Sequence, residues 1–192
     1  MITLIICGAP GCGKGTQSYL IKNKYNLTHL STGDLLRGEI ANNTDLGKTA
    51  NEYISQGQLV PDDMIITILA NKIDSLNFAE TNGIILDGFP RTLPQAEALE
   101  KLLREMGHQT DVLLDLVVEE EELINRLLLR GQTSGRCDDN LETIKKRLTV
   151  YHTQTEPVSE FYKKLGKYTQ INGMGGVDEI FARISKAIDS KQ

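Results

Sequence analysis

The sequence predicts an α/β fold in which helices flank both faces of a five-stranded parallel sheet. Two observations carry this prediction: five short apolar runs alternate with helical patterns, and the run at residues 112–118 is apolar almost throughout. Alternating strands and helices are typical of a parallel sheet covered by helices. A continuously apolar strand is typical of a sheet buried on both faces. With 192 residues, of which 40% are hydrophobic, the chain is long enough for one unit with a hydrophobic core.

The five expected strands are short and rich in aliphatic or β-branched residues. They are residues 2–7, 28–31, 83–87, 112–118 and 168–171, of which the second is the weakest. The fourth run carries one acid, Asp115, to which the pattern assigns no role.

The expected helices between these strands carry apolar residues at helical spacing. They are residues 15–25, 62–75, 94–105 and 120–130. Pro61 before Asp62 and Asp63 marks a helix start, because proline fits the first turn and acids favour the positive end of the helix dipole. A longer helical pattern spans residues 140–165, and Pro157 should kink it or split it in two.

Charge and cysteine content narrow the classes of partner. The formal net charge of −5 argues against nucleic acid or an anionic membrane. Cys7, Cys12 and Cys137 form no C-x-x-C pair, so we expect neither a zinc site nor a disulfide framework. No run approaches the roughly 20 apolar residues that span a bilayer, and residues 1–7 lack the features of a signal peptide. We therefore expect a cytoplasmic protein with reduced thiols.

A glycine-rich loop at residues 8–16, Gly-Ala-Pro-Gly-Cys-Gly-Lys-Gly-Thr, is the strongest motif. It follows the first expected strand and opens the first expected helix, which is the context that a phosphate-binding loop requires. Its glycines let backbone N–H groups surround a phosphate, and the helix N-terminus adds partial positive charge. The expected triphosphate contacts are Gly11, Cys12, Gly13, Lys14, Gly15 and Thr16. By itself, the loop leaves kinases, GTPases and ATPases open.

Further motifs extend to the last third of the chain. They are residues 31–37 (Ser-Thr-Gly-Asp-Leu-Leu-Arg), 87–91 (Asp-Gly-Phe-Pro-Arg) with Gln95, 131–140 (Gly-Gln-Thr-Ser-Gly-Arg-Cys-Asp-Asp-Asn) and Arg147 in the following helix. Together with the loop at residues 8–16, they resemble the adenylate kinase family in its short-lid form. The resemblance implies a P-loop kinase fold and the reaction ATP + AMP ⇌ 2 ADP with Mg²⁺.

The resemblance also implies three parts. The core would comprise residues 1–30, 61–129 and 141–192, the helical monophosphate-binding domain residues 31–60, and the short lid residues 130–140. Long-lid relatives insert a β-rich subdomain here, sometimes with four zinc-binding cysteines, whereas this region holds Cys137 alone. The short-lid form resembles monomeric enzymes, so we expect a monomer without zinc whose lid closes over ATP and AMP together.

Six of the eight arginines lie in or beside these motifs: Arg37, Arg91, Arg126, Arg130, Arg136 and Arg147. Two polyphosphates repel each other, so their alignment needs several cations, and the planar guanidinium binds phosphate oxygens bidentately.

The resemblance implies a role for each arginine. Arg37 and Arg91 would hold the AMP phosphate, and Arg136 and Arg147 would bridge the two substrates. Arg130 would meet the ATP phosphates, while Arg126 and the backbone of Gly175 would contact the ATP adenine. The expected catalytic residues are Lys14, Arg91, Arg130, Arg136 and Arg147.

Thr32 and Gln95 are expected to select the acceptor base. The related uridylate–cytidylate kinases usually place alanine where Thr32 stands and lack Gln95, whose amide can offer a donor and an acceptor to adenine. The expected AMP contacts are Thr32, Arg37, Gln58, Leu59, Val60, Gly88, Phe89, Pro90, Arg91, Gln95, Arg136 and Arg147. This set favours AMP over UMP or CMP.

Three acids have expected roles near the phosphates. Asp87 resembles the residue that holds Mg²⁺ through water, with a turn or helix cap as the alternative. Asp138 and Asp139 either orient the lid arginines or cap the next helix. No catalytic base is expected, because the attacking AMP phosphate is already ionised.

Two other function classes fit the sequence less well. Residues 71–74 (Asn-Lys-Ile-Asp) match a guanine-recognition pattern of GTPases, but they lie in a helical run with no strand immediately before them. A catalytically silent nucleotide sensor would usually have lost Lys14 or a lid arginine, and all of these are present.

Overall fold

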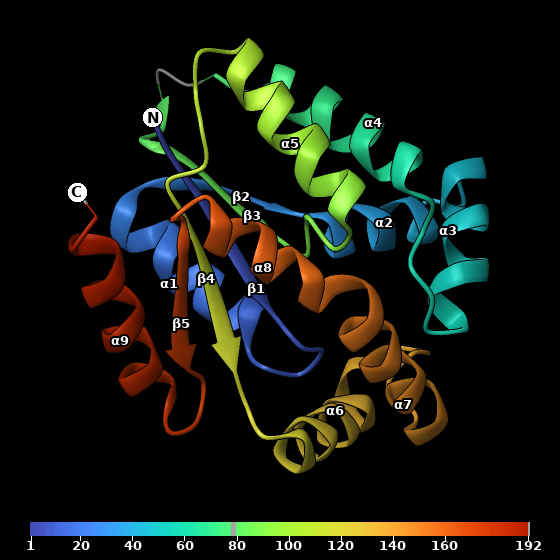
Figure 1. Ribbon diagram of the computed structural model, residues 1–192. Helices are drawn as coiled ribbons and strands as arrows, with labels where there is room; N and C mark the ends of the chain where they lie inside the picture. Colours follow the sequence, from blue (N-terminus) through green and yellow to red (C-terminus); the bar gives the residue numbers. More distant parts are fainter. Residues whose placement is uncertain (78–79, 192) are drawn as a thin grey trace.

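The computed structural model describes residues 1–77 and 80–191, and its centre is a five-stranded parallel sheet. The strands are β1 (Ile2–Gly8), β2 (Leu27–Ser31), β3 (Gly83–Asp87), β4 (Val112–Val117) and β5 (Tyr168–Asn172). Their order across the sheet is β2-β3-β1-β4-β5, which puts β1 in the middle (Figure 1). The predicted fold class and all five predicted strands are therefore confirmed.

Helices alternate with the strands. They are α1 (Lys14–Tyr25), α2 (Thr32–Ala41), α3 (Asp45–Ser55), α4 (Asp62–Asp74), α5 (Leu93–Glu105), α6 (Glu120–Ser134), α7 (Leu141–Val150), α8 (Glu156–Lys164) and α9 (Val177–Asp189). The helical run expected at residues 62–75 is α4, so the GTPase-like residues 71–74 lie on a helix. The sequence analysis did not identify α9, although Ile180, Ile184 and Ile188 recur at helical spacing.

Alternate side chains of β1 enter two hydrophobic clusters, one on each face of the sheet. Leu4 and Ile6 pack with buried residues of α1 and α9, whereas Ile5 and Cys7 pack with buried residues of α4, α5 and α8. Figure 1 shows α1 and α9 on one side of the sheet and α5 and α8 on the other. Burial of both faces explains why these strands are apolar almost throughout.

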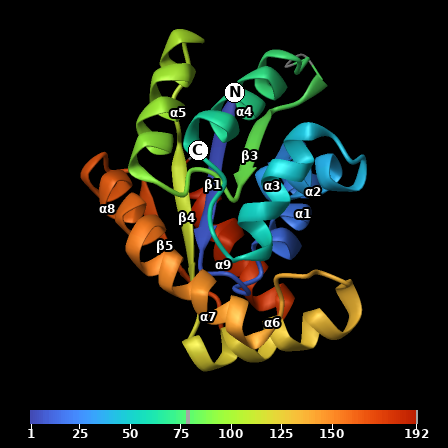
Figure 2. The ribbon, with the colours of Figure 1, turned by 90° about the vertical axis from the view of Figure 1, so that its right-hand side faces the viewer.

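The carboxyl ends of the strands share one edge of the sheet, and the connections there carry the sequence motifs. Ser31 and Ile6 both lie in register with Asp87, so the ends of β2, β1 and β3 are neighbours. In open parallel sheets, ligands bind at this edge. Figure 2 shows α2 with α3, and α6 with α7, as two helical pairs at separate places around it.

The segment expected to be a lid loop is partly helical. Helix α6 extends to Ser134 and ends at Gly135, whose φ of 63° is left-handed. Gly131 lies inside this helix, where a Cβ would come within 2.7 Å of the Asp139 carbonyl oxygen. The irregular part of the lid is therefore limited to residues 135–140.

The prediction that Pro157 interrupts the long helical pattern is confirmed. A π-helical turn, Tyr151–Thr155, separates α7 from α8, and Pro157 lies in the first turn of α8. Proline is tolerated there because its missing N–H has no partner in the first turn.

The acid on β4, Asp115, is buried within the sheet, where β4 lies between β1 and β5. Its Oδ2 accepts a hydrogen bond from the Tyr168 hydroxyl at 2.9 Å and a longer one from Ser159 at 3.4 Å. Burial raises the pKa of the Asp115 carboxyl, and the hydrogen bonds from Tyr168 and Ser159 only partly oppose this.

None of the described helices has the length and apolar composition to cross a bilayer.

Candidate active site

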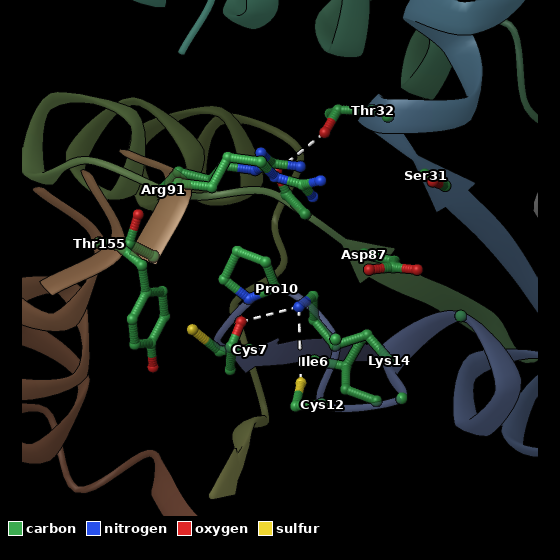
Figure 3. A pocket seen from close by; sticks show the side chains of 18 of the residues that line it. Ile6, Cys7, Pro10, Cys12, Lys14, Ser31, Thr32, Asp87, Arg91 and Thr155 are labelled. Atoms are coloured by element: carbon green, nitrogen blue, oxygen red, sulfur yellow. Dashed lines mark hydrogen bonds between the residues drawn. The ribbon is translucent and has the colours of Figure 1, made fainter. Parts of the chain in front are cut away.

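A cavity of about 850 Å³ lies at the carboxyl edge of the sheet. Its lining comes from the loop after β1, the start of α2, residues 57–60, the segment after β3, α6, α7 and the start of α9. Figure 3 shows Lys14, Asp87 and Arg91 around this cavity, each from a different element. One space thus joins the glycine-rich loop to the motifs expected to bind a second nucleotide.

The phosphate loop ends β1 and begins α1. Gly11 and Gly13 adopt φ values of 88° and 100°, a left-handed region that favours glycine. The Lys14 ammonium donates to the carbonyl oxygens of Gly8 at 2.7 Å and Ala9 at 3.1 Å. It also lies 3.5 Å from Cys12 Sγ, as the dashed line in Figure 3 marks. The cation is therefore held over the loop by the loop's own oxygens.

The segment after β3 is tied to α2 through one carbonyl group. The oxygen of Gly88 accepts hydrogen bonds from Thr32 Oγ1 at 2.8 Å and from Arg91 Nε at 2.7 Å. Gly88 has a φ of 74°, and a Cβ there would come within 2.6 Å of Arg91 Nη2. Glycine at this position lets the half-buried Arg91 side chain fold back over the turn.

Gln95 is almost fully buried, and both ends of its amide are bonded. Its Oε1 accepts from the backbone N–H of Arg91 at 2.8 Å, and its Nε2 donates to Asp62 Oδ1 at 2.7 Å. Asp62 Oδ2 accepts from the Thr92 hydroxyl at 3.0 Å. Gln95 nevertheless contributes to the cavity wall, as do residues 57–60.

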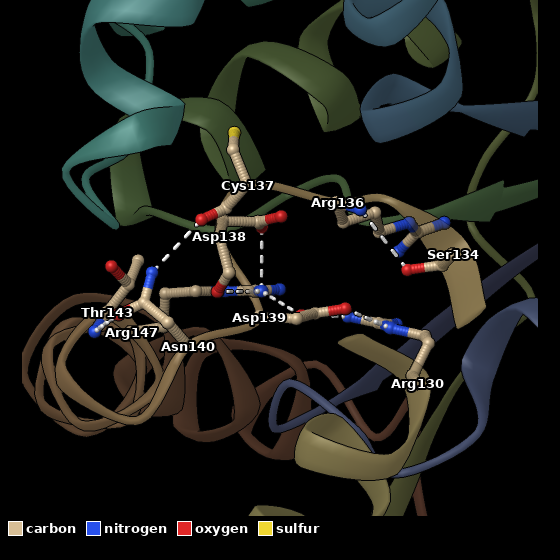
Figure 4. A network of polar contacts seen from close by, with 9 residues as sticks. All are labelled: Arg130, Ser134, Arg136, Cys137, Asp138, Asp139, Asn140, Thr143 and Arg147. Atoms are coloured by element: carbon tan, nitrogen blue, oxygen red, sulfur yellow. Dashed lines mark hydrogen bonds and ion pairs between the residues drawn. The ribbon is translucent and has the colours of Figure 1, made fainter. Parts of the chain in front are cut away.

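Lid acids orient two arginines (Figure 4). Arg130 donates from Nε and Nη2 to the two oxygens of Asp139, each at 2.7 Å. Arg147 Nη1 lies 2.7 Å from Asp138 Oδ2 and 3.1 Å from Asp139 Oδ1. The N-cap of α7 is Asn140, which accepts from the Thr143 N–H at 3.0 Å. Of the two alternatives for Asp138 and Asp139, the structure favours orientation of arginines.

Positive charge accumulates where the cavity walls approach each other. Burial lowers the pKa of Arg91, and the charges of Arg147 and Arg37 lower it further. Burial and the charges of Arg37 and Arg130 likewise lower the pKa of Arg136. In the described part of the chain, neither Arg91 nor Arg136 has an acidic partner within ion-pair distance. This arrangement is suited to binding several phosphate charges.

The Arg130–Asp139 pair behaves differently. Burial acts against both charges, but their mutual hydrogen bonds and attraction outweigh it, so the pKa of Arg130 rises and that of Asp139 falls. Arg130 is therefore a fixed cation in the cavity wall.

Asp87 faces the phosphate loop from the end of β3. It is 8% exposed, and its Oδ2 lies 3.4 Å from His29 Nε2 and 3.9 Å from the point that a Cβ of Gly15 would occupy. Thr92, rather than Asp87, is the N-cap of α5. A carboxylate beside a phosphate loop is a suitable oxygen ligand for Mg²⁺ or its bound water.

At the opposite end from Gln95, α6 and the start of α9 form the wall. Arg126 is held by Glu122, with 2.7 Å between Nε and Oε1, and its guanidinium lies 3.4 Å from the Gly173 carbonyl oxygen. Gly175 and the apolar side chains of Val177 and Ile180 continue this wall. A planar cation beside apolar side chains is an arrangement that suits a base.

Comparison with known proteins gives the same family as the motifs. Residues 6–167 match the family model described as adenylate kinase. The chain is 58% identical over 190 residues to an adenylate kinase of Bacteroides fragilis, an alignment that covers 99% of this chain and 100% of the relative. The chain belongs to the adenylate kinase family. It is accordingly a phosphotransferase of the nucleoside monophosphate kinase class.

Other adenylate kinases align over a similar length. The enzyme of Parabacteroides distasonis is 58% identical over 190 residues, covering 99% of both chains. That of Porphyromonas gingivalis is 48% identical over 189 residues, covering 98% of this chain and 96% of the relative. The similarity therefore includes the lid and the segment before α4 as well as the phosphate loop.

Most residues that the sequence assigned to an adenylate kinase site line this one cavity. They are Gly11, Cys12, Gly13, Lys14, Gly15, Thr16, Thr32, Arg37, Gln58, Leu59, Val60, Asp87, Gly88, Pro90, Arg91, Gln95, Arg126, Arg130, Arg136, Arg147 and Gly175. Phe89 differs: it is 2% exposed and packs in the core with residues of α4 and α5. Its part in the site is to anchor the turn that carries Gly88 and Arg91.

Sequence reasoning missed several residues of the site. Tyr151 and Thr155 of the π-helical turn line the cavity, as do Val177 and Ile180. The amphipathic spacing of α9 could have indicated the last two. Asp62 was read as a helix-start residue, and no local pattern connects it to Gln95, which lies 33 positions away.

Proposed function

We propose that this chain transfers a phosphoryl group reversibly between Mg-ATP and AMP, producing two ADP, within the cavity of about 850 Å³. The observation that carries the proposal is that one space is lined both by the phosphate loop and by the Thr32–Gln95 side. Arg37, Arg91 and Arg136 all line this space, and the charge of Arg37 lowers the pKa of both other arginines, so positive charge is concentrated here.

In the proposed arrangement, ATP occupies the end formed by the phosphate loop, α6 and the start of α9. The N–H groups of the loop and the Lys14 ammonium bind its phosphates, since a helix N-terminus and a full positive charge both favour anions. Arg126 packs on the adenine, whose opposite side meets the backbone near Gly175. Arg130, held by Asp139, contacts the phosphates from the lid.

AMP occupies the other end. Arg37 and Arg91 hold its phosphate, while Gln58, Leu59 and Val60 contact its base. The Thr32 hydroxyl already donates to the Gly88 carbonyl oxygen, so Thr32 acts by shaping the wall beside the base. Gln95 has one amide N–H and one lone pair left after its internal bonds, and these suit an adenine edge.

Transfer in this arrangement needs alignment and charge stabilisation. The attacking oxygen belongs to an ionised phosphate, so no proton has to be removed. Arg136 and Arg147 bridge the donor and acceptor phosphates and stabilise the charge that spreads over the transferred group. Closing of the lid excludes water, which is a competing acceptor.

Mg²⁺ would be held through water by Asp87. The fit rests on a nearly buried carboxylate whose Oδ2 lies 3.9 Å from the point that a Cβ of Gly15 would occupy. The bound ion supplies charge neutralisation at the phosphates of ATP. Among residues 1–77 and 80–191, no group of three or more His, Cys, Asp or Glu side chains forms a metal-binding cluster.

The proposal divides the chain into a core and two parts that move against it, and it takes the enzyme to be a monomer. Residues 31–60 act as the AMP-binding domain and residues 130–140 as the lid against the remaining core. Residues assigned to both nucleotides line one cavity within a single chain, so the proposed reaction requires no second subunit and we propose a monomer. Free thiols at Cys7, Cys12 and Cys137 are in keeping with a cytoplasmic enzyme.

A coupled assay of ADP formation tests the proposal directly. Mg-ATP is the donor, and AMP, UMP, CMP and GMP are each tried as acceptor. We expect a strong preference for AMP. Preference for UMP or CMP would contradict the assignment of Thr32 and Gln95, and a folded protein that binds ATP without transfer to any acceptor would contradict the enzyme assignment.

A further inference from the structure

Asp62 is placed to fix the direction in which Gln95 reads a base. It occupies the first turn of α4, directly after the Gln58–Val60 stretch, and its carboxylate is bonded on both oxygens. Oδ1 accepts from Gln95 Nε2 at 2.7 Å, and Oδ2 accepts from the Thr92 hydroxyl at 3.0 Å. The partial positive charge at the helix N-terminus favours a negative side chain here.

The two internal partners of Gln95 leave its amide only one satisfactory orientation. A carboxylate can only accept, so Asp62 requires the NH₂ group of Gln95 on its side. The Arg91 backbone N–H can only donate, so it requires the carbonyl oxygen on the other side. A reversed amide would set oxygen against carboxylate and NH₂ against N–H, leaving buried polar groups unpaired.

We propose that Asp62 is a positioning residue that locks the Gln95 amide and so makes the acceptor site discriminate adenine from 6-oxopurines. This inference rests on the proposed function, because it takes the Gln95 end of the cavity as the acceptor-base site. The locked amide offers one N–H and one lone pair in a fixed order. Adenine presents an amino donor at position 6 and an acceptor at N1, whereas hypoxanthine and guanine present the reverse.

The hydrogen bonds among Asp62, Thr92 and Gln95 connect the Gln95 amide to the starts of α4 and α5. Asp62 follows Val60 by two positions, and Thr92 is also the N-cap of α5, accepting from the Gln95 N–H at 3.3 Å. The same carboxylate therefore fixes the start of α4, the start of α5 and the Gln95 side chain between them. Val60, the last residue of the Gln58–Val60 stretch, is itself buried at 5% exposure.

Asp62→Asn tests the lock with little change in shape. An asparagine can turn its NH₂ group toward Gln95 and still accept from the Thr92 hydroxyl through its oxygen, so it tolerates the reversed amide. The Arg91 N–H still opposes reversal, so the lock is weakened and not abolished. Asp63→Asn is the matched control, because Asp63 is an exposed acid in the same first turn and makes the same charge change.

The measurement is kcat/KM with Mg-ATP for AMP and for inosine monophosphate, which differs from AMP only at positions 1 and 6 of the base. We expect Asp62→Asn to lower the AMP-to-IMP ratio by about tenfold, chiefly through the acceptor KM, with kcat for AMP near that of the wild type. Asp63→Asn should keep the wild-type ratio. An unchanged ratio in folded Asp62→Asn, or an equal loss for both acceptors, overturns the proposal.

Two additions keep the test decisive. If Asp62→Asn does not fold, Asp62→Ser replaces it, since serine is accepted at helix starts and its hydroxyl can both donate and accept; the same loss of ratio is expected. The wild-type acceptor panel is measured alongside. A wild type that does not prefer AMP contradicts the proposed function itself, whereas an AMP-specific wild type with an insensitive Asp62 variant contradicts the lock alone.

Discussion

Lys14 carries a full charge into the phosphate loop, and its ammonium is bonded to the carbonyl oxygens of Gly8 and Ala9. Those bonds hold the cation in place. Removing the side chain should cost little folding stability, because the positive-φ glycines set the conformation of the loop backbone. The charge itself has no substitute on the loop. Loss of Lys14 should therefore affect transfer more than folding.

Lys14→Ala is expected to lower kcat by roughly a hundredfold or more, because a preorganised charge on the transferring phosphates is removed. The thermal unfolding midpoint should stay close to that of the wild type. Steady-state kinetics and a melting curve on the same preparation check both statements. Full activity in the folded variant would contradict the assigned phosphate site.

Asp115 shows how a single buried acid links stability to pH. Its pKa in the folded protein is raised by burial, so ionising it costs more in the folded state than in the unfolded chain. The cost is absent at low pH, where both states are protonated. It grows as pH rises above the ordinary pKa of aspartate and is complete above the raised folded pKa.

Asp115→Asn should therefore increase the free energy of unfolding at pH 7, and the gain should shrink as the pH falls toward 4. Asparagine can still accept from the Tyr168 hydroxyl through its own oxygen. Urea unfolding of the variant and wild type across this range measures the effect. A gain that is constant with pH would show that ionisation of Asp115 is not its source.

Among the elements, the segment proposed as a lid depends on two of its own acids, Asp138 and Asp139. The Asp139 side chain is fully buried and bonds Arg130 and Arg147 together, while Gly131 brings α6 close enough for this contact. Because α6 continues to Ser134, Arg136 lies just two residues beyond the end of that helix. The geometry of residues 130–140 therefore depends on the length of α6, on the close approach at Gly131 and on the Asp139 carboxylate.

Asp139→Asn should reduce stability by about 2 kcal/mol, because charged hydrogen bonds to two arginines are lost. It should also reduce kcat, since Arg130 and Arg147 lose their common anchor. Asp138→Asn is the comparison, because it leaves Asp139 and the bidentate contact to Arg130 intact and should cost less in both measurements. Equal effects of the two substitutions would argue against Asp139 as the anchor.

How far the sequence predicts these elements depends on whether the signal is local. The five strands, the phosphate loop and the interruption at Pro157 are all set by neighbouring residues, and each was predicted. The end of α6 was not, because Gly131 and Gln132 resemble a loop unless the packing of Gly131 against Asp139 is known. Asp62 was missed as a site residue for a similar reason, since its bond to Gln95 exists only after α4 and α5 pack.

At the scale of the whole molecule, the pairs α2–α3 and α6–α7 face a common cavity that contains mutually repelling arginines. The charge of Arg37 lies close enough to lower the pKa of Arg91 and of Arg136, each of which lies on another element. Phosphates of two nucleotides would remove that repulsion and connect the two pairs. One nucleotide alone would supply fewer of these contacts.

We therefore expect solution X-ray scattering to show a smaller radius of gyration with ATP and AMP together, or with a bisubstrate analogue, than with either nucleotide alone. Turnover is prevented by omitting Mg²⁺ or by using the analogue. Failure of the analogue to compact the protein would contradict lid closure as part of the mechanism.

The distribution of the three cysteines has a practical consequence. Cys7, on β1, and Cys12, within the phosphate loop, are both buried, whereas Cys137 is exposed in the irregular segment 135–140. A maleimide dye applied to the folded, unmodified sequence should therefore attach selectively to the segment expected to move. The natural protein thus carries a built-in attachment point for a fluorescent reporter, and lid motion can be followed in real time without engineering a new thiol.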